Sequence, residues 1–398
     1  MQRVSTWMQF AAGEQAISAR QRELLDAQRR VASGQRIATP SDDPIGSAAA
    51  ATLRSGLSQL EQFRSNQSHA RFLLSQSENV VAQFSEAVVD ARDRLLAAAN
   101  DSYGDGERLM MARELESVLA RMVALANTTD GLGGFLFAGT REGAAPFAQS
   151  GTDVAYVGDG NEKRLEVAGR RLMKTSFTGE DVFLRIRAGN GSFTTAAADS
   201  NSGSGRIGAG GVTDPSALTG SDYAIEYDGA QYVVTRLADS VQFTFPPGSG
   251  GTTLQFDGVQ VRISGAPAAG DQFEVRPAGL QSIFDTMAQA IAALQLPAAN
   301  AAERARVATL VGGAIASIDG AYDHLLLKRA EIGASLAELD GLGQLREVRD
   351  LDLQGRLSDV ADVDYAEAIT HLTRRQTAFE AAIKSYSTVS RLSLFDYL

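Results

Sequence analysis

The chain of 398 residues contains no cysteine, and this absence excludes several kinds of site at once. Without thiols there is no disulfide, no thiolate metal site and no cysteine nucleophile. Histidine is scarce as well. His69, His324 and His371 each fall in a stretch that is expected to be helical, and none belongs to an HExxH pattern. We therefore interpret the histidines as surface or packing residues, and we expect no metal ion and no cofactor.

An excess of basic residues is also missing. The chain has 37 Lys and Arg residues against 48 Asp and Glu residues, so its net charge is −11. A nucleic-acid-binding protein needs a basic face, which this balance does not favour. No run of about 18 apolar residues is long enough to span a membrane, and the first residues lack the features of a cleaved signal peptide. We expect no nucleic-acid partner and no membrane insertion, and any export would have to proceed without a cleaved signal.

Catalytic motifs are absent too. The sequence has no GxSxG, kinase, dinucleotide-binding or EF-hand pattern. The adjacent carboxylates of Asp42 and Asp43 could suggest a metal site, but a capped turn explains them better, because Asp43 can cap a helix that begins at Pro44. A hydrolase site hidden in the β-rich region has no residues to support it. We expect no catalytic residues and a protein that is not an enzyme.

Long helices dominate what is present. Apolar residues spaced by three and four positions predict helices over residues 4–33, 45–100, 107–127, 280–294 and 301–354. In the first of these, Phe10, Ile17, Leu24 and Val31 recur every seven residues, which favours packing against another helix. The first three helices are expected to lie side by side as antiparallel rods.

The last 37 residues, 362–398, predict a closing helix with a similar stripe. Eight exposed apolar side chains would make this helix an association surface, because fully burying each is worth ~1.5–3 kcal/mol. We therefore predict an assembly interface formed by both chain ends. Its residues are Val4, Trp7, Phe10, Ile17, Leu24, Val31, Ile369, Leu372, Phe379, Ile383, Tyr386, Val389, Leu392 and Phe395. For the N-terminal stripe, packing within its own domain is an equally good interpretation.

Residues 180–278 are rich in β-strand signals. Asp228-Gly229 and Asp257-Gly258 each separate two strand-like segments and predict two hairpins. Earlier in the chain we expect a short buried strand over residues 135–138 and a hairpin over residues 153–168 with its tip at 158–161.

The predicted fold is mainly α with a β-rich insertion. A long antiparallel α-helical coiled-coil rod is built from both chain ends, with small β-hairpins and a separate β domain. The expected divisions are an N-terminal assembly helix (1–40), the N-terminal half of the rod with a β-hairpin (41–179), a β-rich outer domain (180–278), the C-terminal half of the rod (279–360) and a C-terminal assembly helix (361–398).

The turn between the first two helices carries a resemblance to a known family. SGQRI at residues 33–37, followed by DDP at 42–44, resembles the segment between the first two helices of the flagellin family. The motif residues are Ser33, Gly34, Arg36, Ile37, Asp42, Asp43 and Pro44. The stretches at residues 362–369, 393–398 and 134–139 resemble the members that form the junction between hook and filament. The resemblance covers about residues 1–175 and 279–398.

The resemblance implies a structural subunit of the bacterial flagellum, located outside the cell and exported unfolded through the flagellar type III secretion channel. It also implies partners: further copies of the chain in a ring-like homo-oligomer, the first hook-associated protein below, flagellin above, and a cytosolic export chaperone. Filament flagellin is the alternative within the family, and a non-flagellar coiled-coil scaffold is the alternative outside it.

Overall fold

The structure, a computed structural model, describes residues 6–100, 103–131, 133–141 and 143–391. It confirms the predicted class, a mainly helical chain with a central β-rich region. Contacts divide the chain into two units. The terminal unit consists of Met1–Ser65 with Gly341–Leu398, and the central unit consists of Asn66–Asp340. The five segments expected from the sequence remain a prediction.

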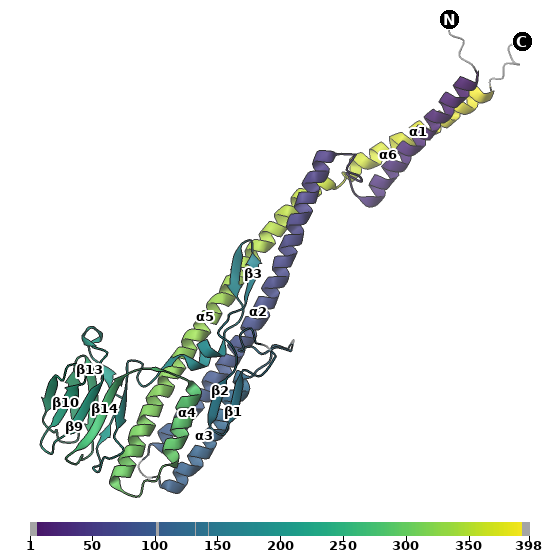
Figure 1. Cartoon of the computed structure of the whole chain (residues 1–398). Coiled ribbons are helices and arrows are strands. Elements are labelled where there is room, and N and C mark those ends of the chain that lie inside the picture. The colour runs from purple at the N-terminus through teal and green to yellow at the C-terminus, as the bar shows by residue number, and fades with distance from the viewer. Residues whose placement is uncertain (1–5, 101–102, 132, 142, 392–398) are drawn as a thin grey trace, which may run out of the picture. The chain divides into compact units, whose positions relative to one another are not determined.

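Six α-helices make up most of the described part of the chain (Figure 1). They are α1 Thr6–Ser33, α2 Pro44–Ala98, α3 Asp105–Ala126, α4 Ile283–Gln295, α5 Ala301–Ala361 and α6 Tyr365–Arg391. The predicted cap at Asp43 is confirmed, and Asp364 caps α6 in the same way. The Asp43 carboxylate accepts from the Gly46 N–H at 2.9 Å, and the Asp364 carboxylate accepts from the Ala366 N–H at 2.9 Å. These bonds satisfy donors that have no partner inside the helix.

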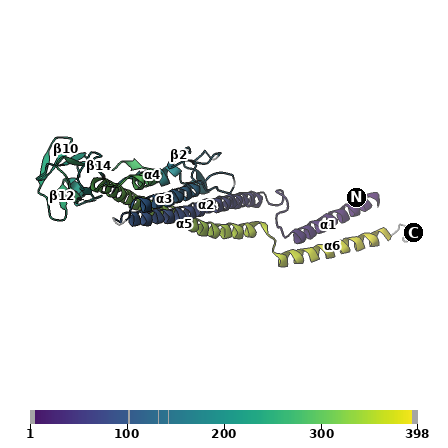
Figure 2. The ribbon, with the colours of Figure 1, turned by 90° about the horizontal axis from the view of Figure 1, so that it is seen from below.

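In the terminal unit, α1 and α6 lie side by side and run antiparallel (Figures 1 and 2). Phe10 meets Tyr386 near one end of the pair, and Gly34 meets Val363 at the other. The expectation that α1 would lie beside the next two helices is therefore wrong. The reason is that α1 and α6 carry stripes of the same period, whereas the part of α2 in this unit packs on α5, with Gly56 close to Leu353.

In the central unit, α3 and α4 lie alongside the stretches of α2 and α5 that belong to it (Figures 1 and 2). Phe183 is in ring contact with four other phenylalanines at its centre. All five rings are at most 2% exposed: Phe84, Phe137, Phe147, Phe183 and Phe284. The Phe84 and Phe183 centroids are 4.4 Å apart, so this aromatic cluster is a closely packed core.

Two small hairpins lie on the helices of the central unit. Strands β1 Phe147–Ser150 and β2 Asp153–Tyr156 form one, and β3 Arg164–Ala168 and β4 Arg171–Lys174 form the other. The single hairpin expected over residues 153–168 is wrong, because the chain reverses at Gly151 and Arg170, both with positive φ. The strand expected over residues 135–138 is also wrong: Phe135 forms one bridge with Thr129, and turns follow it.

The β-rich region joins the helices through β5 Ile186–Arg187 and β15 Leu280–Gln281, which pair with each other. A π-helical turn, η1 Glu180–Leu184, precedes this neck. One sheet has five strands in the order β11 Gln242–Phe245, β10 Tyr232–Arg236, β9 Tyr223–Tyr227, β14 Asp271–Pro277 and β6 Phe193–Ala197. The other contains β12 Thr252–Phe256, β13 Val259–Ser264, β7 Arg206–Ile207 and β8 Gly211–Val212, with a short 3₁₀ turn, η2 Pro215–Ala217, before β9.

Both hairpins predicted in this region are confirmed. β9 pairs with β10 across Asp228-Gly229, and β12 pairs with β13 across Asp257-Gly258. Gly229, Asp257 and Gly258 have φ values of 98°, 43° and 75°, the left-handed geometry that such tight turns require. The inner faces of the two sheets share one buried apolar cluster. In the part of the chain that the structure describes, no helix is long and apolar enough to cross a membrane.

Candidate assembly surface at the paired chain ends

The motif after α1 is the point where the outgoing and returning parts of the chain are joined. Gly34 has φ 68° and ends α1, with its N–H donating to the Arg30 carbonyl at 3.0 Å. Its own carbonyl accepts from the Val363 N–H at 2.9 Å. A Cβ at Gly34 would lie 2.7 Å from the Tyr365 hydroxyl. Glycine is therefore needed here both for the backbone conformation and for the space.

Arg36 connects the same motif to the end of α5. Its N–H donates to the Ala361 carbonyl at 2.8 Å, and its guanidinium donates to the Val360 carbonyl at 2.7 and 3.1 Å. The guanidinium also pairs with Asp43 at 3.2 Å. The last carbonyls of a helix have no partner within it, so Arg36 supplies donors that the end of α5 needs. We call Gly34, Arg36, Asp43, Val360 and Val363 the basal hub.

The two adjacent carboxylates shape the turn. Asp42 accepts from the Thr39 and Ala38 N–H groups at 2.9 and 3.2 Å. The pKa of Asp42 is lowered below its usual range, mainly by the hydrogen bond from the Thr39 N–H. The pKa of Asp43 is lowered in the same way, mainly by the hydrogen bond from the Gly46 N–H. Among the described residues, no group of three or more His, Cys, Asp or Glu side chains is placed to hold a metal ion.

The remaining motif residues support this turn. The Ser33 hydroxyl lies 3.5 Å from the Arg30 carbonyl, to which it donates, and accepts from the Gln35 N–H at 3.3 Å. The Ile37 side chain is half-buried and lies next to Gly46, where an added Cβ would come within 2.7 Å of it. Pro44 is the first residue of α2, where its missing N–H has no consequence.

The seam between α1 and α6 is only partly closed. Ile17, Leu24 and Val31 on α1 are half-buried, and so are the side chains on α6 that share the heptad spacing, Leu372, Phe379 and Tyr386. Phe10 is 39% exposed and meets the Tyr386 ring edge-on, with the centroids 6.3 Å apart. None of these side chains reaches the burial found in the aromatic cluster of the central unit. Further burial is therefore available to the pair if another surface covers it.

The other residues predicted for the interface are either exposed or outside the residues that the structure describes. Trp7, Ile369 and Ile383 are 77%, 52% and 43% exposed. Val4, Leu392 and Phe395 lie outside the described residues, as does the side chain of Val389. The part that any of these residues takes in assembly stays a prediction.

The stripes of large apolar side chains do not identify three further residues of the seam, which are Gly13, Glu23 and Arg375. Gly13 makes room for Tyr386, because an added Cβ would lie 2.5 Å from the ring. Arg375 reaches across to Glu23 at 2.5 Å, and Arg20 pairs with the same carboxylate at 2.9 Å. The hydrogen bond from Arg20 contributes most to lowering the pKa of Glu23, and Arg375 adds to it. Each of these residues acts through a residue on the facing helix, so no signal within one stretch of sequence identifies them.

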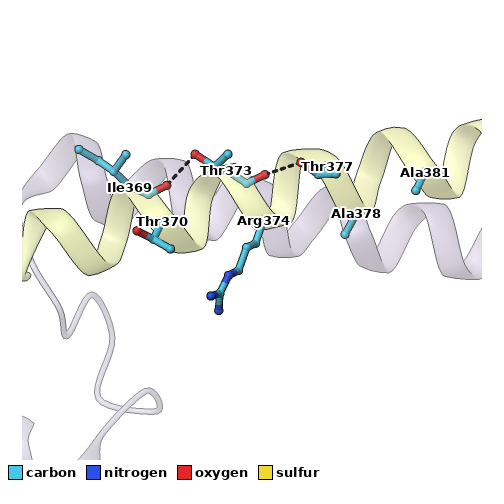
Figure 3. A pocket seen from close by; sticks show the side chains of 7 residues that line it. All are labelled: Ile369, Thr370, Thr373, Arg374, Thr377, Ala378 and Ala381. Carbon is cyan, nitrogen blue, oxygen red and sulfur yellow. Dashed lines mark hydrogen bonds between the residues drawn. The ribbon is translucent and has the colours of Figure 1, made fainter.

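Part of α6 borders an open hollow of about 600 Å³ (Figure 3). It is lined by Ile369, Thr370, Thr373, Arg374, Thr377, Ala378 and Ala381. The hydroxyls of Thr370, Thr373 and Thr377 donate to carbonyls four residues earlier in the helix, at 2.8–3.0 Å. Because these hydroxyls already have partners, an apolar surface can cover them without leaving a donor unpaired.

The chain is similar to flagellar proteins along nearly its whole length. Residues 4–142 match the bacterial flagellin N-terminal helical region, and residues 196–277 match the D2-like domain of flagellar hook-associated protein 1. The chain is 25% identical to flagellar hook-associated protein 3 of Escherichia coli (strain K12) over 394 residues. This match covers 99% of this chain and 98% of the relative.

Solved structures agree with this likeness. FlgL of Xanthomonas campestris is 30% identical, with a TM-score of 0.71, and the match covers 77% of this chain and 99% of that one. Hook-associated protein 3 of Legionella pneumophila shares the fold, with a TM-score of 0.73 at 24% identity over 78% of this chain and 98% of that one. The fold is that of a flagellar structural protein of the flagellin type. More narrowly, the chain belongs to the family of hook-associated protein 3, or FlgL.

Proposed function

We propose that the protein is a structural subunit of the bacterial flagellum that forms the junction between hook and filament by self-assembly through its terminal helices. The observation that carries this proposal is the half-open α1–α6 pair, anchored by the basal hub, in a chain that matches hook-associated protein 3 from end to end. The solved FlgL of Legionella pneumophila, which shares this fold, is described as a flagellar junction protein.

The seam residues support assembly through the chain ends. Leu372 and Phe379 are half-buried in the pair that α6 forms with α1, and Ile369 and Ile383 remain exposed beside them. Fully burying one such side chain is worth ~1.5–3 kcal/mol, so covering several of them in each subunit favours association. A neighbouring subunit is the partner that the proposal assigns to this surface.

Several finer points belong to the same proposal. The subunits form a ring-like homo-oligomer, with the first hook-associated protein on one side and flagellin on the other. The likeness of residues 196–277 to the D2-like domain of hook-associated protein 1 supports a place beside that protein in the flagellum. The chain reaches the exterior through the flagellar type III secretion channel without a cleaved signal peptide, accompanied in the cytosol by an export chaperone.

The proposal is tested in cells that lack the protein. A junction subunit predicts intact hooks without filaments and unassembled flagellin in the medium, with filaments restored when the intact chain is supplied. If filaments form normally without the protein, the proposal is wrong. A filament composed of this chain, the alternative function, predicts instead that no other flagellin accumulates in the medium.

One substitution connects this test to the seam. Phe379→Asp would bury an unpaired carboxylate in the assembled junction, at a cost of several kcal/mol per subunit. Phe379→Leu keeps an apolar side chain and serves as the matched control. We expect flagellin to stay on the hooks with Phe379→Leu and to be lost with Phe379→Asp, while the melting temperature of the central unit stays unchanged in both. A Phe379→Asp monomer whose central unit melts many degrees lower would show that Phe379 belongs to the monomer's core.

A further inference from the structure

We propose that Glu23 and Arg375 set the register in which α1 pairs with α6, a role that the apolar residues of the seam cannot fill alone. The two side chains are joined across the seam at 2.5 Å, and Arg20 holds the same carboxylate at 2.9 Å. This role concerns only the pairing of α1 with α6, so it does not depend on whether the protein forms the junction or a filament.

The apolar part of the seam is nearly periodic. Phe10, Ile17, Leu24 and Val31 recur every seven residues along α1, and Leu372, Phe379 and Tyr386 recur every seven along α6. Sliding α6 by one heptad, in either direction, places at least two of these three α6 side chains where another large apolar one was. The transfer of apolar surface from water is then almost the same in both registers, so hydrophobic burial discriminates poorly between them.

The charged residues do not repeat in this way. One heptad of sliding brings Arg375 opposite Arg30 in one direction and opposite Ala16 in the other. At the same time, Glu23 comes to face Ala382 or Ala368. Both slipped registers lose the ion pair, and one of them also brings two arginines together.

The choice of register depends on the difference in free energy between the native and the slipped registers. An ion pair that is partly exposed in the native register still contributes to that difference. The side chains of Glu23 and Arg375 are 38% and 42% exposed, which makes the pair modest as a source of stability. A polar contact at one seam position nevertheless selects alignment in helix pairs, because the alternatives leave it unmatched. Gly13 also favours the native register. It leaves room for the Tyr386 ring, whereas sliding Tyr386 toward α2 would place that ring against Arg20.

The basal hub also holds the two helices at one end, through the bond between Gly34 and Val363. The experiment therefore has to separate the hub from the ion pair. Arg375→Glu leaves the hub intact, repels Glu23 in the native register and attracts Arg30 in the slipped one. The inverted variant R20E/E23R/R375E restores attraction across the seam with all three signs reversed.

Because the chain contains no cysteine, introduced thiols report the register directly. Ile17→Cys with Ala382→Cys is the native pair, since these positions lie one helical turn from the contact between Gly13 and Tyr386. Leu24→Cys with Ala382→Cys is the slipped pair. Each pair is placed in the full chain and treated with a short thiol cross-linker, and the product is measured by mass spectrometry. Arg29→Glu is the charge control, because its ion-pair partner is Asp26 on the same helix.

We expect the unaltered chain and Arg29→Glu to cross-link at the native pair. Arg375→Glu should lose most of that product and gain the slipped one, and the inverted variant should regain the native product. The milder Arg375→Gln should weaken the native cross-link without increasing the slipped one.

Three outcomes overturn the proposal. Native cross-linking that Arg375→Glu leaves unchanged would assign the register to the hub and the apolar seam. A loss that the inverted variant does not restore would mean that the pairing of charges is not the cause. A loss without any slipped product, restored on inversion, would mean that the ion pair strengthens the helix pair without selecting its register.

Discussion

The terminal and central units are both built on long helices, yet they bury their apolar side chains to very different degrees. In the central unit, five phenylalanine rings are at most 2% exposed and contact one another. In the terminal unit, Phe10 is 39% exposed and Phe379 is only half-buried. The same kind of heptad spacing therefore produces a finished core in one unit and an unfinished surface in the other.

The difference comes from the number of layers around each helix. In the central unit, α3, α4, η1 and the small hairpins surround α2 and α5, so an inward side chain meets neighbours on several sides. Among the described residues, the main partner of α1 is the single helix α6, which covers one side of its seam. Two helices leave the flanks of their seam in contact with water, so a part of the hydrophobic stabilisation stays unused in the isolated chain.

The largest effect expected from this contrast follows from shortening one phenylalanine in each unit. Phe183→Ala should reduce the free energy of unfolding by about 3–5 kcal/mol, because it leaves a cavity among four other rings. Phe379→Ala should cost less than about 2 kcal/mol, since that side chain is already half in water. Urea unfolding followed by circular dichroism measures both. Equal losses would contradict the difference in burial.

The next effect concerns the basal hub. Gly34→Ala forces a non-glycine residue into φ 68° and places a methyl group against the Tyr365 hydroxyl, so we expect a loss of about 1–2 kcal/mol confined to the terminal unit. Hydrogen exchange at the Val363 amide, which donates to Gly34, reports this loss.

The matched glycine control lies in the central unit. Gly312 is inside α5, and an added Cβ would meet nothing within 4 Å, so Gly312→Ala should stabilise the helix by up to about 1 kcal/mol. If Gly34→Ala leaves exchange at Val363 unaltered, the hub does not hold the chain ends together.

Removing the β-rich region should have a smaller effect on the helices. The Ala188 N–H donates to the Gly279 carbonyl at 3.0 Å, so the two ends of the region are neighbours. Deleting residues 190–277 and joining the ends with a short linker should leave the helical circular dichroism and the melting of the helices nearly unchanged. The deletion starts after Gly189, and not at residue 180, so that Phe183 of the aromatic cluster is kept. A deleted chain without helical signal would show that the helices depend on the β-rich region.

The smallest effect expected is a local response to acid at Asp159. The Thr140 hydroxyl and N–H donate to its carboxylate and lower its pKa to about 2. A lowered pKa in the folded state stabilises the loop above the unfolded value of about 4, and this contribution disappears as the pH falls from about 4 to 2. Proteolysis of the segment between residues 138 and 161, which contains the β1–β2 hairpin, should therefore increase as the pH falls through that range when an acid-active protease is used. Asp159→Asn should show a weaker dependence on pH, and an identical dependence would exclude this cause.

The sequence predicted the helices and two of the β-hairpins well, because their signals are local. Capping by Asp43 and Asp364 fixed where two helices begin, and the Asp-Gly pairs at 228 and 257 supplied the positive φ that tight turns need. The hairpin expected over residues 153–168 failed because the turn at Arg170 has a positive φ without a glycine at that position. The Gly158–Asn161 stretch instead forms a connection that Asp159 holds to Thr140.

The candidate assembly surface was predictable in part. The apolar stripes identified α1 and α6, but the pairing partner of α1 depends on which two stripes meet, and a single helix does not contain that information. Following large apolar residues also passed over Gly13, Glu23 and Arg375, which contribute a hole and an ion pair to the seam. Neither has any meaning until the facing helix is known, so neither could be recognised from one stretch of sequence.

Hydrogen exchange on the isolated, full-length protein tests the central claim most directly. If the α1–α6 pair is an unfinished surface, amides in residues 10–31 and 369–388 should exchange much faster than those of α2 and α5 around the aromatic cluster. In the assembled flagellum, the same amides should become protected. Strong protection of both terminal stretches in the monomer, equal to that of the central unit, would contradict the account and make the seam an ordinary core.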